Sequence, residues 1–274
     1  MDDTWHFAAP GELLHYPGTK VGLATDAKVS HLDADNSTAV LADGRRVKYN
    51  KCLVAIGGKP KQLPELDRNL DADQVTYFRK LSDFKKLEKQ SREQFSGKTI
   101  AVVGGGFLGS ELAVALGKQA DRHDFKVNQI IKEKGNLGYI LPDYLSKWTT
   151  EKVKKCNVNV VPNERITGAS KLKNGKIQLK LISGKKMIVD HVVAAVGLEI
   201  DEKFAENSDL EWDSKLNGFM VNSELQARSN VWVAGDATSF YDIRLGRRKV
   251  EHHDHAIVSG RLAGANMAAI GQFW

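Results

Sequence analysis

The sequence has few cysteines and lacks any long apolar run. Its two cysteines, Cys52 and Cys156, lie far apart, and neither belongs to a CxxC or CxxxxC pair. A redox dithiol is therefore not encoded in this stretch, and we expect two buried or half-buried thiols. No apolar run approaches the roughly 20 residues of a membrane span, and the acidic segment 1–12 has no apolar signal core. We therefore expect neither a membrane helix nor a targeting segment.

The excess of basic residues is small. The net charge is +6 and the pI is about 9.1. This balance permits an acidic partner, nucleic acid included, although a solvated basic surface is the commoner explanation. Hydrophobic residues make up 42% and charged residues 27% of the chain, which is ordinary for a globular protein. A length of 274 residues suits about two domains.

The most informative stretch is residues 98–112. An apolar run leads directly into a glycine-rich turn, and a helical pattern follows it; the turn consists of Gly104, Gly105, Gly106, Phe107, Leu108 and Gly109. In a GxGxxG motif the first glycine permits the tight turn, the second lets the backbone approach a pyrophosphate, and the third lets the helix pack close to the strand. The N–H groups at the helix start then face the phosphates. The pattern predicts a dinucleotide site, with a purely structural turn as the alternative.

A second strand and an acidic residue follow at the expected distance. Residues 127–131 form the strand pattern, and Glu133 lies about 24 residues beyond Gly109. An acid at this place accepts hydrogen bonds from the adenosine ribose hydroxyls. The neighbouring Lys132 and Lys134 are expected to be solvated, or else to soften the discrimination against a 2′-phosphate. We favour NADH over NADPH.

The remaining elements follow from alternation, turn residues and helical spacing. We expect strands at 21–24, 27–32, 38–41, 46–49, 53–56, 158–161, 166–169, 177–182, 186–189, 191–196, 216–221 and 232–234. We expect helices at 83–92 with Ser82 as N-cap, at 143–155 with Tyr144, Leu145, Trp148 and Val153 as its apolar members, and near 251–270. The segment 59–73 is rich in proline and charge, which suits a crossing between domains.

One pattern occurs twice. Residues 43–58 and 183–197 each contain a charged hairpin turn, a return strand and an apolar strand that ends in glycine; the strand at 53–56 is expected to be buried. Two related units suggest two similar nucleotide-binding domains. A third strand then ends at Gly235, and Asp236 stands where the next turn begins.

Together these elements resemble the flavoprotein reductases that bind two dinucleotides, and more narrowly the apoptosis-inducing-factor family. The resemblance is carried by GGGFLGSELA, EKGNLGYILPDYLS, DHVVAAVGLE, ELQARSNVWVAGDA, FYDIRLGRR and VEHHDHAIVSGRLAGANM. It implies an α/β fold of two Rossmann-like, glutathione-reductase-like domains with β-meander elements. The NAD-binding domain, 59–198, would be inserted in an FAD-binding domain made of 1–58 and 199–274.

The resemblance also implies an activity and a setting. The family is an FAD-dependent NADH oxidoreductase of the mitochondrion, in the intermembrane space or associated with the inner membrane, that reaches the nucleus in apoptosis. A mitochondrial import partner and an NADH-linked homodimer belong to the same expectation. The family carries a first FAD loop and a C-terminal domain that are absent here, so we expect an incomplete chain. Tyr139 stands where the family often has lysine, which weakens one expected contact to NAD.

Site residues are carried over by position. The vicinity of the nicotinamide and the flavin would hold Glu111, Gly197, Glu251 and His252, while FAD contacts would come from Val29, Arg79, Asp236, Glu251, His252 and His253. Glu111 is alternatively an N-terminal helix acid that suits the dipole, and Arg79 an ordinary surface cation. A helix N-terminus at Glu251 would stabilise negative charge on the reduced flavin.

Two further kinds of site, a metal site and a DNA contact, are considered for the last third of the chain. His252 and His255 fall on one helical face, but no third ligand has convincing spacing, so we expect no metal. Arg244, Arg247, Arg248 and Lys249 form a basic cluster, either a solvated loop or a set of ion pairs. The DNA association of the family suggests non-specific phosphate contacts through Arg247, Arg248 and Lys249.

Other functions stay open beside the reductase. One is a redox-gated interaction protein that binds DNA and mitochondrial partners, with incidental catalysis. Another is a ferredoxin-type or rubredoxin-type NADH reductase, against which the EHHDH and GRRK motifs argue.

Overall fold

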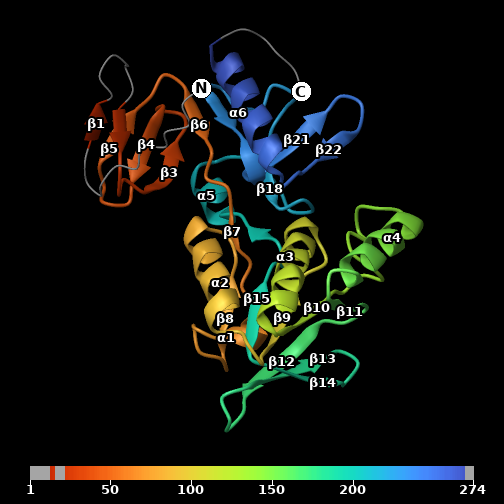
Figure 1. Cartoon of the computed structure of the whole chain (residues 1–274). Helices are drawn as coiled ribbons and strands as arrows, with labels where there is room; N and C mark the ends of the chain where they lie inside the picture. The colour runs from red at the N-terminus through yellow and green to blue at the C-terminus, as the bar shows by residue number, and fades with distance from the viewer. Residues whose placement is uncertain (1–12, 16–21, 269–274) are drawn as a thin grey trace. The chain divides into compact units, whose positions relative to one another are not determined.

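The computed structural model describes residues 13–15 and 22–268, which fall into two compact units (Figure 1). Unit 1 combines Met1–Gly58 with Ile200–Trp274, and unit 2 is the continuous segment Lys59–Glu199. Within the described residues, no helix is both long and apolar enough to cross a membrane. Cys52 and Cys156 are half-buried free thiols, as expected.

Unit 2 is built on a parallel sheet. Its elements are β7 (Lys59–Pro60), α1 (Pro64–Asp67), β8 (Val75–Tyr77), α2 (Leu81–Glu93), β9 (Thr99–Val103), α3 (Phe107–His123), β10 (Lys126–Ile130), α4 (Asp143–Lys154), β11 (Val158–Val161), β12 (Ile166–Lys171), β13 (Ile177–Leu181), β14 (Lys186–Val189), β15 (His191–Ala194) and β16 (Leu198–Glu199). The sheet has the order β11-β10-β9-β15-β8, and every neighbouring pair is parallel.

The two faces of this sheet have different covers. Ile100 and Val102 of β9 pack with Leu112 and Leu116 of α3, on the side that also receives α2. The alternate residues of β9, with Ile177 and others, form a second cluster against the antiparallel meander β12-β13-β14. Figure 1 shows the two long helices beside the central strands and the meander beyond the strands. The α/β fold class with meander elements is therefore confirmed.

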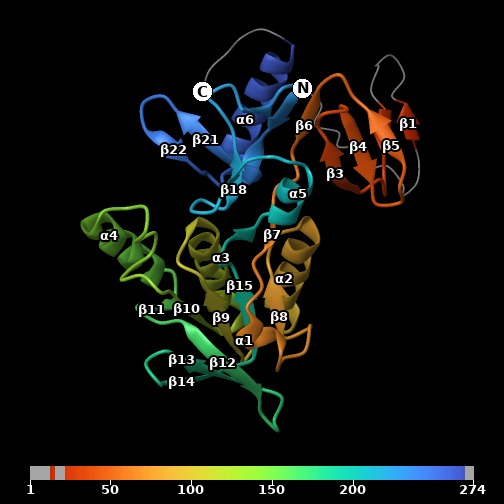
Figure 2. The same cartoon turned by 180° about the vertical axis from the view of Figure 1, so that it is seen from behind.

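Unit 1 is assembled from several small sheets. Its elements are β1 (Leu13–His15), β2 (Gly22–Ala24), β3 (Val29–Asp33), β4 (Thr38–Leu41), β5 (Arg46–Lys48), β6 (Cys52–Val54), α5 (Glu202–Asn207), β17 (Trp212–Asp213), β18 (Gly218–Met220), β19 (Gln226–Arg228), β20 (Val231–Val233), the 3₁₀ turn η1 (Gly235–Ala237), β21 (Thr238–Asp242), β22 (Gly246–Arg248) and α6 (His253–Met267). Figure 2 shows β3, β4 and β5 as a layer separate from β21 and β22.

The repeated sequence pattern is a repeated structure. In each copy a hairpin turn carries a glycine with positive φ, +87° at Gly44 and +85° at Gly184, and a return strand follows. The next strand then joins a parallel pair, β6 with β20 and β15 with β9. Both copies therefore have the strand–turn–strand arrangement that the sequence predicts.

One strand in the first copy is less buried than expected. We predicted a buried strand at 53–56, but β6 ends at Val54 and only Val54 is buried, while Leu53 is 36% and Ile56 47% exposed. Among the described residues β6 pairs with β20 alone, so it is an edge strand with one open side.

Several helix limits also differ from the prediction. α2 begins at Leu81 with Lys80 as N-cap, because the Asp83 carboxylate accepts the backbone N–H of Lys80 at 2.7 Å; the predicted cap at Ser82 is wrong. α6 begins at His253 rather than Glu251, and residues 269–274 lie outside the described part of the chain. The predicted crossing at 59–73 contains β7 and α1.

The predicted apolar members of α4 are only partly buried: Val153 lies in the core and Leu145 is half-buried. Tyr144 and Trp148 are 75% and 58% exposed, and the buried residues of α4 are Ser146, Thr150 and Val153. Two of these three inward residues are polar, so the contacts of α4 are partly hydrogen bonds.

Candidate dinucleotide site

The strand order of unit 2 reverses between β9 and β15. From β9 the chain continues through α3 to β10 on one side, whereas β15 and β8 lie on the other side. Ligands of open α/β sheets bind outside the carboxyl ends of the strands at such a switch point. The turn 104–109 leaves β9 at this place, where Ala195 follows β15.

The glycines of this turn occupy three different environments. Gly104 has φ +128°, and a Cβ there would lie 2.1 Å from the Ala195 carbonyl oxygen. A Cβ on Gly109 would lie 2.4 Å from the Gly104 carbonyl oxygen, so only glycine lets α3 approach the turn. At Gly106, by contrast, the nearest atom is the Tyr139 hydroxyl at 3.4 Å. Gly106 is half-buried, and a Cβ there would be in ordinary van der Waals contact with the Tyr139 side chain, so no steric clash of the kind found at Gly104 and Gly109 occurs there.

The helix that follows offers its N-terminus at the same place. α3 has Gly106 as N-cap and begins at Phe107. The first N–H groups of a helix have no intrahelical acceptor and attract anions. Phe107 and Leu108 are 46% and 38% exposed. A pyrophosphate fits this donor set, since its oxygens need several backbone N–H groups and no bulky side chain in between.

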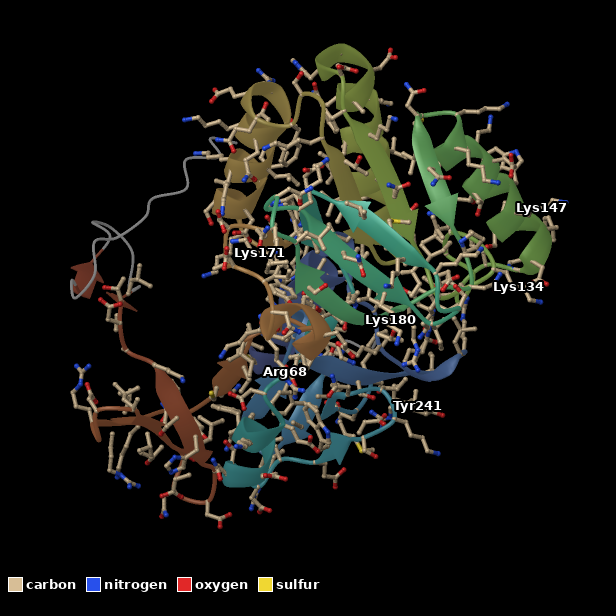
Figure 3. All side chains as sticks on the ribbon, turned by 90° about the horizontal axis from the view of Figure 1, so that it is seen from below. Arg68, Lys134, Lys147, Lys171, Lys180 and Tyr241 are labelled. Carbon is tan, nitrogen blue, oxygen red and sulfur yellow. The ribbon has the colours of Figure 1, made fainter. Side chains whose placement is uncertain are left out.

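Glu133 lies beside the glycine turn. Its side chain is 17% exposed, and Oε2 is 3.1 Å from the position of a Cβ on Gly105. Lys132 is solvated, with Nζ 3.8 Å from Oε1 of Glu133. Glu133 and Lys134 also line a hollow of about 560 Å³ between the loop after β10 and α4. Figure 3 shows Lys134 and Lys147 on the α4 side of this unit.

Glu111, Gly197 and Arg79 also belong to unit 2. Glu111 is exposed and is the fifth residue of α3, so the first turn contains no acid and the helix-dipole interpretation is wrong. Gly197 has φ +97°, and its carbonyl accepts the Lys61 N–H at 3.0 Å. Arg79 is exposed, and its backbone N–H donates to Asp83 at 3.0 Å.

Most of the predicted FAD contacts lie in unit 1. Val29 begins β3 and is half-buried, and Asp236 lies in η1 directly after β20. The turn is tied to α6 because the Gly235 N–H donates to Ser259 Oγ at 2.9 Å. Glu251, His252 and His253 are exposed around the start of α6, with His252 as its N-cap. The structure thus brings η1 and α6 together.

His252 and His255, the two histidines considered as metal ligands, lie in different environments. His252 is exposed, whereas His255 is 5% exposed and stacks on Phe240 with ring centroids 4.9 Å apart. His255 Nε2 lies 3.2 Å from Thr238 Oγ1, and burial lowers the pKa of this histidine. His255 is therefore part of the packing between α6 and β21.

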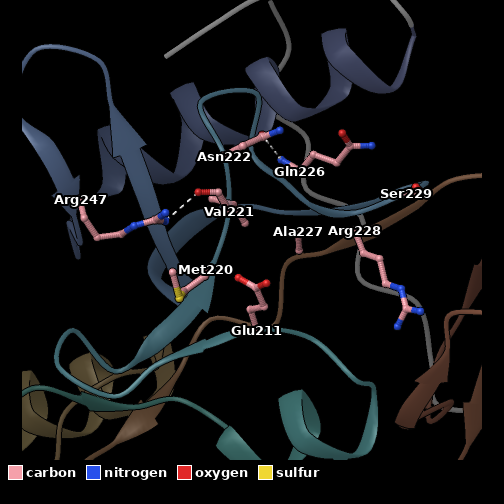
Figure 4. Close-up of a pocket in the computed structure, with 9 residues that line it drawn as sticks. All are labelled: Glu211, Met220, Val221, Asn222, Gln226, Ala227, Arg228, Ser229 and Arg247. Carbon is pink, nitrogen blue, oxygen red and sulfur yellow. Dashed lines mark hydrogen bonds between the residues drawn. The ribbon is translucent and has the colours of Figure 1, made fainter.

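The basic cluster is largely engaged within unit 1. The Arg247 guanidinium donates to the carbonyls of Val221 at 2.7 Å and Ser239 at 2.6 Å, beside a hollow of about 340 Å³ (Figure 4). The Lys249 side chain is 9% exposed, donates to the Asn217 carbonyl at 2.7 Å and lies 3.0 Å from Glu251. Arg248 lies 3.8 Å from Asp242.

Sequence reasoning missed two buried amides behind the glycine turn. Gln129 and Asn136 are each 0% exposed. The available signal was a polar residue within an apolar strand pattern, since Gln129 stands between Val127 and Ile130. Both amides donate hydrogen bonds, although Asn136 Oδ1 has no partner among the described residues, and the acceptors of these bonds show what the amides hold in place.

Comparison with known proteins agrees with this architecture. Residues 5–260 match the model of the pyridine nucleotide-disulphide oxidoreductase family. The chain is 40% identical over 264 residues to the putative apoptosis-inducing factor 1, mitochondrial, of Drosophila melanogaster, covering 95% of this chain and 35% of that protein. It is 40% identical over 259 residues to apoptosis-inducing factor 1, mitochondrial, of Dictyostelium discoideum, covering 94% and 47%. The chain thus spans between about a third and a half of the length of these two relatives.

A solved structure shows the same fold. The complex of putidaredoxin reductase with putidaredoxin matches with a TM-score of 0.78 at 21% identity, over 90% of this chain and 58% of that one.

Proposed function

Because the chain belongs to the pyridine nucleotide-disulphide oxidoreductase family, we propose that it is part of an FAD-dependent NADH oxidoreductase of the apoptosis-inducing-factor type. The observation that carries the proposal is the glycine turn 104–109, with Glu133 beside it, at the switch point of a parallel sheet. When bound, NADH supplies a hydride and FAD accepts it.

The residues of unit 2 bind and orient NADH in this proposal. Backbone N–H groups of 104–109 hold the pyrophosphate, together with the N-terminus of α3. Glu133 accepts hydrogen bonds from the adenosine ribose, and its negative charge opposes a 2′-phosphate. Glu111 and Gly197 lie toward the nicotinamide.

The residues of unit 1 hold FAD in this proposal. Asp236 follows β20 as the acid of the GD motif, and Val29 contributes backbone. The N-terminus of α6, with Glu251, His252 and His253, faces the flavin and favours negative charge on it. Arg79, in unit 2, is the remaining FAD contact of the proposal.

One spectroscopic experiment tests this function. The purified chain, supplied with FAD, is expected to show flavin absorbance near roughly 450 nm, and NADH should bleach it. NADH should act at lower concentration than NADPH. A protein whose bound flavin NADH leaves oxidised, or one that binds neither FAD nor NADH, would contradict the proposal.

The cellular setting is a further part of the proposal. Two relatives carry "mitochondrial" in their names, which supports a mitochondrial protein. Placement in the intermembrane space or at the inner membrane, nuclear relocation in apoptosis, an import partner and an NADH-linked homodimer rest on the resemblance to the family alone.

The alternative function, a redox-gated interaction protein that binds DNA, has less support, because two of its three predicted DNA contacts are already engaged within the protein. Arg247 and Lys249 already donate to backbone carbonyls of unit 1, so a phosphate would compete with those bonds. A salt-sensitive mobility shift of duplex DNA that disappears in Arg248→Ala would support this alternative, because Arg248 holds the longest contact of the three, 3.8 Å to Asp242. The likeness to putidaredoxin reductase concerns the fold, and leaves a ferredoxin-type reductase as an alternative.

A further inference from the structure

A cluster of buried polar side chains lies between the glycine turn and α4. Its members are Gln129 and Asn136 at 0% exposure, Ser146 at 4%, Thr150 at 6% and Ser110 at 8%. Burying polar groups costs free energy unless their hydrogen bonds are made. The cluster therefore has to be explained by what its members bond.

The hydrogen bonds have one allowed direction. Gln129 Nε2 donates to the Gly104 carbonyl at 2.9 Å, and a carbonyl can only accept. Gln129 must then present Oε1 to Asn136, whose Nδ2 donates to it at 2.8 Å and to Ser110 Oγ at 2.9 Å. The orientation of both amides follows from this chain of donors, since the flipped forms would place oxygen against oxygen.

The same cluster reaches the next peptide of the turn. The Gly105 carbonyl accepts the Leu137 N–H at 2.7 Å and the Ser110 hydroxyl at 3.4 Å. In a trans peptide the C=O and the following N–H point in opposite directions. Fixing the carbonyls of Gly104 and Gly105 on the inner side therefore turns the N–H groups of Gly105 and Gly106 outward.

α4 holds the other end of the cluster. The Asn136 N–H donates to Thr150 Oγ1 at 2.8 Å, and Ser146 Oγ donates to the Asn136 carbonyl at 2.8 Å. Asn136 is thus bonded through both its backbone and its side chain. This explains why α4 buries Ser146 and Thr150 while Tyr144 and Trp148 stay exposed.

We propose that Gln129 and Asn136 are positioning residues that fix the peptide planes of the glycine turn for a pyrophosphate-bearing dinucleotide, without contacting it. The inference rests on the proposed binding of NADH to this turn. A carbonyl of the turn that pointed outward would repel the negative phosphates. A turn that is free to adopt this flipped peptide orientation must give it up when the dinucleotide binds, which costs affinity.

The test compares ligand affinity among three variants of the full chain. Gln129→Met keeps the length of the side chain and removes both the donor to Gly104 and an acceptor of the Asn136 amide. Ser110→Ala removes one donor to Gly105 and the other acceptor of that amide. Asn159→Ala is the matched control, because Asn159 donates to Asn128 at 2.7 Å on the same sheet but outside the cluster. Calorimetric titration with NADH and with ADP-ribose gives the dissociation constants. The limiting rate of flavin reduction and the melting temperature are measured in parallel.

We expect Gln129→Met to weaken NADH and ADP-ribose alike by about tenfold, and Ser110→Ala by about threefold, because a freer turn has to give up its other peptide orientations before it binds. The limiting rate of flavin reduction should stay unchanged, and Asn159→Ala should bind normally. Lower melting temperatures with unchanged affinity for both ligands would overturn the inference and leave the proposed function intact. A wild-type chain that binds neither ligand would contradict the proposed function, and the inference would fall with it.

Discussion

At the scale of single residues, the two acidic residues near the glycine turn, Glu133 and Glu111, differ in how their surroundings hold them. Glu133 is half-buried beside Gly105, so its carboxylate is held near the turn rather than extended into solvent. Glu111 shows the opposite case, because its place in α3 is exposed and beyond the first turn. Of these two acids, only Glu133 has neighbouring atoms that restrict the position of its carboxylate.

We predict that Glu133→Ala reduces the preference for NADH. The variant loses charged hydrogen bonds to the ribose hydroxyls, about 1.5–3 kcal/mol or at least tenfold in kcat/KM for NADH. The value of kcat/KM for NADPH should fall less or rise, because the carboxylate no longer opposes the 2′-phosphate. Steady-state kinetics with both nucleotides measure this. Glu88→Ala, at an exposed site of α2, is the control, and an unchanged NADH/NADPH ratio in Glu133→Ala would refute the assigned role.

His191 makes stability depend on pH. It is 4% exposed, Thr76 Oγ1 lies 2.9 Å from Nε2, and burial, with a smaller contribution from Lys86, lowers its pKa to about 4. The unfolded chain, with a histidine pKa near 6.5, binds the proton more readily than the folded chain. His191 therefore stabilises the fold above about pH 6.5, and this stability is lost as the pH falls toward 4.

We predict that the free energy of unfolding falls by about 3 kcal/mol between pH 6.5 and 4 on account of this group. In His191→Gln the pH dependence of the unfolding free energy should be correspondingly shallower, as measured by urea denaturation at several pH values. Identical slopes in His191→Gln and the wild type would show that His191 is not the responsible group.

At the scale of elements, close backbone approach decides how α3 packs. Gly117, in the middle of α3, lies so near the loop before β11 that a Cβ would be 2.0 Å from the Cys156 carbonyl oxygen. Gly260 also lies in a helix, α6, but among the described residues no atom outside its own stretch of helix lies within 4 Å of the corresponding position. Two helical glycines thus have opposite steric surroundings.

We predict opposite effects of alanine at these two positions. Gly117→Ala should destabilise the protein by about 1–3 kcal/mol, because the added methyl group forces α3 away from its neighbour. Gly260→Ala should be neutral or stabilise by up to about 1 kcal/mol, since alanine favours the helix. Thermal unfolding of both variants measures the difference. Equal melting temperatures would contradict the packing described for α3.

At the scale of the whole molecule, unit 2 has the properties of an inserted domain. It is continuous in sequence, it has clusters of buried residues on both faces of its sheet, and its ends lie side by side because β7 pairs with β16, Pro60 opposite Leu198. Adjacent termini are what an insertion into another unit requires. The assignment of this unit as the NAD-binding domain stays a proposal.

We predict that residues 59–199 fold alone and bind NADH without FAD. Circular dichroism should show one cooperative thermal transition, and calorimetry should show an affinity within a few-fold of that of the full chain. A non-cooperative transition would show that the segment needs unit 1 to fold. Cooperative folding without NADH binding would place the site elsewhere.

By itself, the sequence determined the glycine turn, the repeated strand–turn–strand unit and the α/β class. These are local patterns, in which glycines, turn residues and apolar periodicity act within a few residues of one another, and β4, β11 and β14 have the predicted positions. The sequence did not predict β8, because Val75–Tyr77 is only three residues long and too short to show an alternating pattern. For α4 it counted the exposed Tyr144 and Trp148 with the buried Val153, and it missed Ser146 and Thr150, because apolarity says nothing about a buried polar partner such as Asn136. Only the tertiary structure could decide those contacts, since each depends on a group that folding alone brings near.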